Sequence, residues 1–218
     1  MRWLPLEANP DVLNKYLEKL GVKGPWKFHD ILGLDEQNLN TITGQVAAVL
    51  LVFPKSEAEL EKKLGQETAD ETVTVIKQTV DQACGSVAIL HALINCNELI
   101  PVEPGSVLDT FVSKIKKMTP AERGHAMEHE KDLFNLHETM AKEGQSKTPA
   151  RESETNQLYV CFIHHKGHLY ELDGRRALPV THGNTTDGTL LQDTAKVIKK
   201  FVERDSNKVN FSMLVLSS

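Results

Sequence analysis

The segment from Lys77 to Gly85 holds the residues best suited to covalent chemistry. Cys84 precedes an apolar run at 87–94 that is typical of a buried helix, and Gln78 lies six residues upstream. A helix N-terminus carries partial positive charge and unpaired N–H groups, which favour a thiolate and lower the pKa of a thiol. A thiolate is the nucleophile of cysteine hydrolases, and an amide can donate to a developing oxyanion. The alternative is a buried structural cysteine beside a tightly packed Gly85.

The composition limits the classes of function. The 218 residues are 40% hydrophobic and carry a net charge of −5, with a mean hydropathy of −0.32, so we expect a sizeable core in one or two domains. The absence of a basic, aromatic-rich patch argues against nucleic acid as a partner. The longest apolar run, 46–53, is too short to cross a bilayer, so we expect no membrane partner.

The cysteines and the first ten residues indicate the cellular compartment. Three cysteines form no paired spacing, which argues against a disulfide framework and favours a reducing compartment. Residues 1–10 contain no apolar signal-peptide region. We therefore expect a cytoplasmic location, with the nucleus as an alternative. We expect Cys96 and Cys161 to be inert core residues.

Hydrophobic periodicity predicts the elements that must position Gln78 and Cys84. Strands and helices mix along the whole chain without a linker, which predicts one α/β or α+β domain over residues 1–218. A polar stretch at 145–156 is typical of an exposed loop. The expected helices are 12–20, 57–64, 84–96, 107–117, 120–130, 133–142 and 190–204, and the expected strands are 46–53, 73–76, 158–163, 169–172, 176–180 and 209–216.

Several segments together resemble the ubiquitin C-terminal hydrolases, which are papain-like thiol deubiquitinases, and in particular their short single-domain members. The most specific is Gly167-His-Leu-Tyr-Glu-Leu-Asp-Gly-Arg175, paired with Lys77-Gln-Thr and Ala83-Cys-Gly85; further matching segments are 2–10, 49–54, 120–123, 143–145, 182–183 and 209–211. The resemblance implies a central sheet flanked by helices, with a papain-like cysteine peptidase architecture and a knotted backbone. It also implies a crossover loop at about 145–157 that arches over the active site.

The resemblance further implies the substrate and the roles of individual residues. The substrate would be the C-terminal tail of ubiquitin, or of a close ubiquitin-like protein, carrying a small leaving group. Cys84 matches the nucleophile, Gln78 the oxyanion donor and Asp173 the acid that orients the catalytic histidine. Glu7 and Arg175 match positions near the ubiquitin tail and the active-site scaffold. We expect a monomer that needs no cofactor and no metal.

The family's catalytic histidine has no counterpart in this chain. In the family it precedes the acidic residue by fifteen positions, and counting back from Asp173 gives Leu158. His164 shares a strand face with Leu158 but is six residues further along, or roughly 20 Å away. A general base must lie within hydrogen-bond reach of its target, so we expect His164 and the adjacent His165 to be surface residues near a turn.

The remaining histidines offer no replacement either. His168 belongs to the family segment without a catalytic role there, and His91 is expected to be a core histidine. A metal site built from His164, His165, His168 and His182 is disfavoured, because no cysteine or carboxylate completes a recognised ligand spacing.

The loss of the histidine leaves two hypotheses for function. One is a thiol-dependent deubiquitinase whose turnover is strongly reduced, with a smaller loss for ester and thioester leaving groups, which need less protonation. The other is a catalytically impaired pseudoenzyme that binds ubiquitin. A structural protein unrelated to ubiquitin is a third and weaker possibility. In each case Asp173 needs a new partner, for which Arg175, Arg176 and water are the candidates.

Overall fold

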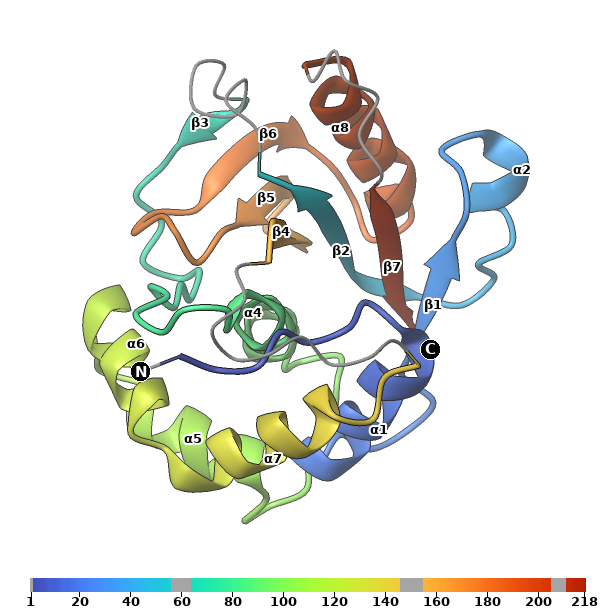
Figure 1. The fold of residues 1–218 in the computed structure, drawn as a ribbon. Helices are drawn as coiled ribbons and strands as arrows, with labels where there is room; N and C mark the ends of the chain where they lie inside the picture. Colours follow the sequence, from blue (N-terminus) through green and yellow to red (C-terminus); the bar gives the residue numbers. More distant parts are fainter. Residues whose placement is uncertain (1, 56–63, 146–154, 205–210) are drawn as a thin grey trace.

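The computed structural model describes residues 2–55, 64–145, 155–204 and 211–218. Its centre is a seven-stranded sheet in the order β1-β7-β2-β4-β5-β6-β3, in which neighbouring strands run antiparallel (Figure 1). The strands are β1 (Lys27–Ile31), β2 (Val46–Pro54), β3 (Gln66–Glu67), β4 (Gln157–His165), β5 (His168–Leu172), β6 (Val180–Asn184) and β7 (Ser212–Ser217).

The helices form layers on the two sides of this sheet. In Figure 1, α8 (Leu190–Arg204) lies on one side of β2 and β4, and α4 (Cys84–Asn95) lies on the other. Outer helices surround α4 on the side away from the sheet, so α4 is enclosed by other elements. These are α1 (Pro10–Leu20), α5 (Val107–Ile115), α6 (Pro120–Glu128) and α7 (Lys131–Ala141), and the short α2 (Glu36–Leu39) follows β1.

The interior strand β2 is buried on both faces because helices cover both. All of its residues from Val46 to Phe53 are buried, which explains why its sequence is a continuous apolar run rather than an alternating one. Leu50 and Val52 belong to the core cluster that contains α4, whereas Val49 and Leu51 belong to the cluster that contains α8. The predicted strand at 46–53 is confirmed.

The predicted helices form where periodicity and capping residues agree. In α1 the Asn9 side chain accepts a hydrogen bond from Asp11 N, and Gly21 ends the helix at a φ of 101°. Residues 85–94 of α4 are all buried, as expected of a helix that is apolar on every side. The hairpin of β4 and β5 turns at Lys166 and Gly167, whose φ angles of 47° and 83° are typical of a tight two-residue turn.

The predicted strand at 73–76 is wrong. Residues 73–76 belong to no strand, and several of their backbone groups bond to side chains instead of to a neighbouring strand. Thr74 N donates to Asn95 Oδ1 at 2.7 Å, and Asn95 Nδ2 donates back to Thr74 O at 2.9 Å. Ile76 N donates to His91 Nε2 at 2.9 Å. Side chains of helix α4 therefore satisfy backbone groups of this segment that would otherwise need a partner strand.

Other differences concern short elements. The strand expected at 176–180 is instead β6, which begins at Val180, and β1, α2 and β3 were not expected from the sequence. The helix expected at 57–64 and the crossover loop expected at about 145–157 fall largely outside the described residues. No helix within the described ranges is long and apolar enough to cross a membrane.

Candidate active site

Cys84 is the first residue of α4, and its side chain is partly buried among neighbours from three segments. Its Sγ lies 3.8 Å from the carbonyl oxygen of Gln157, at the start of β4. The next residue, Gly85, lies so close to the N-terminal segment that a Cβ there would approach Leu6 Cβ to 3.1 Å. Tyr159 packs on the same side of Gly85, and its hydroxyl donates to Leu6 O at 2.7 Å. Because Gly85 has no side chain, the first turn of α4 can pack directly against Leu6 and Tyr159.

The ionisation of Cys84 differs from the sequence-based expectation. Burial raises the pKa of the Cys84 thiol above its usual value, because the thiolate loses solvation. Backbone N–H groups of Tyr159 and Gly85 and the positive charge of Lys55 oppose this shift. Burial therefore outweighs the lowering of the thiol pKa that was predicted from the helix N-terminus. The Cys84 thiol stays protonated to a higher pH than the thiol of an exposed cysteine.

Gln78 is fixed beside the loop that carries Asp173. Gln78 N donates to Gly174 O at 2.7 Å, and a Cβ on Gly174 would lie 3.0 Å from Gln78 Cβ. The side-chain Nε2 donates to Val80 O at 2.8 Å. An amide nitrogen carries two N–H groups, so one remains for a developing oxyanion.

Asp173 is buried, and its carboxylate is hydrogen-bonded to an arginine. Its side chain is 3% exposed. Arg175 N and Nε donate to Oδ1 at 2.8 and 3.0 Å, and Arg175 Nη2 donates to Oδ2 at 2.6 Å. Arg176 Nε lies further away, at 3.9 Å from Oδ2. Of the three partners left open by the sequence, Arg175 is the principal one and Arg176 makes a weaker contact.

Leu158 lines the same cavity as Cys84 and carries no titratable group. It lies at the start of β4, opposite Phe53 of β2, and is buried in the cluster that contains α8. A cavity of about 260 Å³ brings Leu158 together with Cys84, Gln78 and Arg175. The full set that lines this cavity is Lys55, Gln78, Thr79, Val80, Asp81, Gln82, Cys84, Thr155, Gln157, Leu158 and Arg175.

Glu7 lies outside the residues that line this cavity. Its carboxylate accepts hydrogen bonds from Asn9 Nδ2 at 3.2 Å and from Gln145 N at 3.4 Å. Gly144 packs against it so closely that a Cβ would lie 2.1 Å from Glu7 Oε2. Glu7 therefore joins the N-terminal segment to the residues that lead into the expected crossover loop.

The histidines occupy other places in the fold. His164 Nδ1 lies 2.6 Å from Asp187 Oδ1, and its Nε2 accepts from Gly167 N at 3.0 Å, so it supports the hairpin turn. His165 Nε2 lies 2.8 Å from Thr72 Oγ1. His91 is fully buried in α4, as expected of a core histidine. None of these side chains lines the Cys84 cavity, and in the described part of the chain no three His, Cys, Asp or Glu residues are grouped as metal ligands would be.

A buried hydrogen-bond network near Cys84 could not be predicted from the sequence. Ser86 Oγ lies 2.8 Å from Tyr16 Oη and 2.7 Å from His137 Nδ1, and His137 Nε2 lies 2.7 Å from Leu4 O. These contacts join α4, α1, α7 and the N-terminal segment. Because the partners are far apart in sequence, neither spacing nor periodicity could connect them.

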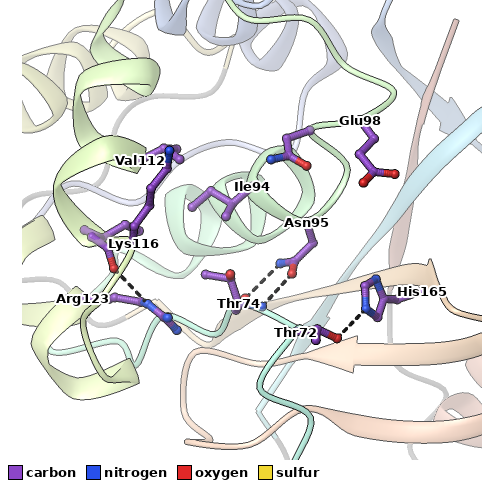
Figure 2. A pocket seen from close by; sticks show the side chains of 11 residues that line it. Thr72, Thr74, Ile94, Asn95, Glu98, Val112, Lys116, Arg123 and His165 are labelled. Carbon is purple, nitrogen blue, oxygen red and sulfur yellow. Dashed lines mark hydrogen bonds between the residues drawn. The ribbon is translucent and has the colours of Figure 1, made fainter.

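A second cavity, of about 300 Å³, lies near the C-terminal end of α4 (Figure 2). Arg123, Lys116, Asn95 and His165 contribute to its lining, and Asn95 bonds to Thr74 within it. None of the residues assigned a catalytic or substrate-binding role lines this cavity.

Comparison with known proteins identifies the family of this chain. A model of the family described as "Ubiquitin carboxyl-terminal hydrolase, family 1" matches residues 3–203. The chain is 39% identical over 223 residues to ubiquitin carboxyl-terminal hydrolase isozyme L1 of Macaca fascicularis, covering 99% of this chain and 98% of that protein. It is also 39% identical over 206 residues to a ubiquitin carboxyl-terminal hydrolase of Aplysia californica, covering 94% and 96%.

A solved structure has the same fold. The catalytic domain of Trichinella spiralis UCH37, bound to ubiquitin vinyl methyl ester, matches with a TM-score of 0.82 at 21% identity, covering 100% of this chain and 96% of that one. The predicted fold class, a central sheet flanked by helices in an α/β arrangement, is confirmed. With a family model that matches nearly the whole chain, this protein belongs to ubiquitin carboxyl-terminal hydrolase family 1.

Proposed function

We propose that this chain binds the C-terminal tail of ubiquitin, or of a close ubiquitin-like protein, and cleaves small adducts from it slowly through Cys84. The relatives at 39% identity are named ubiquitin carboxyl-terminal hydrolases, and the solved structure with the same fold is bound to a ubiquitin derivative. Cys84 and Gln78 line one cavity with Arg175, which binds Asp173, and this arrangement supports the same chemistry. In this proposal the protein acts as a monomer in the cytoplasm or nucleus.

The observation that supports slow turnover is the position of Leu158. It lines the cavity that contains Cys84, and Asp173 is bound to Arg175 rather than to an imidazole. A histidine at this position would hold the cysteine as a thiolate and protonate the leaving amine. Leucine does neither, and burial raises the pKa of the Cys84 thiol.

The same observation favours a second candidate function, a pseudoenzyme that binds ubiquitin without cleaving it. Binding of a peptide tail depends on the shape and hydrogen bonding of the cleft, which do not require a general base. The two candidates therefore share the binding step and differ only in whether the carbon–nitrogen bond is broken.

The decisive experiment measures hydrolysis of a ubiquitin C-terminal amide by the native chain, Leu158→His and Cys84→Ala. We expect the native chain to be slow, Leu158→His to be faster by about tenfold or more, which is about 1.4 kcal/mol of activation free energy, and Cys84→Ala to be inactive. Fast turnover of the native chain with no gain in Leu158→His would contradict the proposal and would require another base.

Binding is tested separately by titrating ubiquitin into the Cys84→Ala variant. Saturable binding without turnover of the native chain would support the pseudoenzyme. Absence of saturable binding would rule out both candidate functions.

A further inference from the structure

Two cationic residues, Arg175 and Lys55, line the Cys84 cavity, and the role of Lys55 is not yet explained. Lys55 follows the end of β2 and lines the cavity together with Cys84 and Leu158. Its backbone is fixed on both sides, since Lys55 N donates to Asn156 O at 2.9 Å and Asn156 Nδ2 donates to Lys55 O at 3.4 Å. The cavity wall therefore includes a lysine whose main chain is anchored to the strand that carries Leu158.

Lys55 and Leu158 lie at the paired ends of β2 and β4. Phe53 is the register partner of Leu158 in the β2–β4 pair, and Pro54 pairs with Gln157. Lys55 follows Pro54 directly, and its backbone N donates to Asn156 O, one residue before Gln157. Lys55 thus lies at the end of β2 that pairs with the start of β4, where Leu158 occupies the position of the family's histidine.

The two cations that line the cavity differ in their ion pairs. Within the described ranges, no carboxylate forms an ion pair with Lys55, whereas the other cation of the cavity, Arg175, is occupied by Asp173. The positive charge of Lys55 also lowers the pKa of the Cys84 thiol, against the effect of burial.

We propose that the ammonium group of Lys55 supplies the positive charge that stabilises the Cys84 thiolate in the absence of a catalytic histidine. The other charged or titratable groups around Cys84 cannot take this role. Asp81 lines the cavity as a carboxylate and disfavours a thiolate, the Arg175 charge is balanced by Asp173, and Tyr159 is a buried phenol whose pKa is raised further by burial. The consequence for turnover rests on the function proposed above, but the ionisation of Cys84 does not.

The test uses alkylation of Cys84 by iodoacetamide, in which the thiolate sulfur displaces iodide and forms a carbon–sulfur bond. Its rate follows the thiolate fraction, and mass spectrometry of the Cys84 peptide separates it from the buried Cys96 and Cys161. The rate is measured against pH for the native chain, Lys55→Met, Lys55→Arg and the control Lys199→Met. The control removes the same charge from an exposed position on α8.

We expect Lys55→Met to move the midpoint of the pH profile upward by about half a unit to one unit, which slows alkylation at neutral pH by about three- to tenfold. Lys55→Arg should keep the native profile, and Lys199→Met should not change it. An unchanged profile in Lys55→Met, or the same shift in Lys55→Arg and Lys55→Met, would overturn the proposal, because charge would then not be the cause.

Salt provides a second measurement that needs no variant. Because mobile ions screen a partly exposed charge pair, added salt should raise the midpoint in the native chain. A salt-independent profile would contradict the proposal. Alkylation involves no ubiquitin, so failure here leaves the proposed hydrolase function standing, and failure of hydrolysis leaves the Lys55 result standing.

Discussion

Arg175 binds both carboxylate oxygens of Asp173, through Nε and Nη2, at distances between 2.6 and 3.0 Å. A planar guanidinium matches a carboxylate in this two-pronged geometry better than any other side chain. The acid that would orient a catalytic histidine therefore already has a charged partner. This contact stabilises the end of the sheet beside Gln78, whose backbone N donates to Gly174 O.

We expect Arg175→Met to destabilise the fold by about 2 kcal/mol, between the values for an exposed pair and a buried one. The reason is that Asp173 is 3% exposed while the Arg175 side chain is 37% exposed. Urea unfolding measures the loss, with Arg175→Lys retaining the charge but not the two-pronged contact. Lys23→Met is the control, because in its pair with Glu103 both side chains are more than half exposed. Equal losses in the two methionine variants would contradict this assignment.

The leaving group should change the effect of Leu158. A thiolate departs from a thioester without a proton, so attack by the Cys84 thiolate forms one carbon–sulfur bond, breaks another and needs no general acid. An amine leaving group must be protonated. We expect the ratio of thioester to amide cleavage to be higher in the native chain than in Leu158→His, measured on ubiquitin thioester and ubiquitin amide substrates. An equal ratio in both chains would show that leaving-group protonation does not limit the native protein.

His91 should make the fold sensitive to mild acid. Burial lowers the pKa of His91 from its usual 6.5 to about 4, with the Asp173 charge acting in the opposite direction. Its Nε2 accepts from Ile76 N, which requires the neutral ring. Between pH 6.5 and 4 the unfolded chain binds a proton that the folded chain does not, so stability falls as pH falls, by about 3 kcal/mol in total.

His91→Gln isolates this contribution, because glutamine offers an acceptor oxygen that does not titrate. Urea unfolding at a series of pH values should show a shallower loss of stability for His91→Gln over this window, whatever its stability at neutral pH. Parallel curves for the two proteins would rule out His91 as the source.

Gly124 should be intolerant of any side chain. A Cβ at this position of α6 would lie 1.9 Å from Lys77 O and 2.9 Å from Thr79 Cγ2, so alanine would push α6 away from the segment that carries Gln78. We expect Gly124→Ala to lose about 1–3 kcal/mol in thermal or urea unfolding. Gly188→Ala, with its nearest atom at 4.0 Å, should change stability by less than about 0.5 kcal/mol. A harmless Gly124→Ala would show that α6 can shift freely.

The sequence predicted long elements well and short ones poorly. Helices α1 and α8 were found because each has an apolar stripe with helical spacing, and α1 also has an Asn9 cap and a Gly21 stop. Strand β1 was missed because only Phe28 and Ile31 of its five residues are buried. The strand expected at 73–76 failed because side chains of α4, which periodicity cannot anticipate, satisfy its backbone.

The candidate site was predicted in part. Segment matches placed Cys84, Gln78 and Leu158 around one cavity, but they did not choose between Arg175, Arg176 and water for Asp173. The direction predicted for the Cys84 pKa was wrong, because the burial that raises it comes from segments far apart in the chain, such as the one that carries Gln157. Lys55 carries no motif and is recognised only by the cavity that it shares with Cys84.

The placement of β7 has a consequence for the order in which this molecule can assemble. The strand lies between β1 and β2, so residues from near the two ends of the sequence must meet before β1 can join the sheet. Pairings of such high sequence separation form late and slowly. The sheet on which α4 packs is therefore completed only when β7 pairs, and a chain cut before β7 would lack the strand that joins β1 to β2.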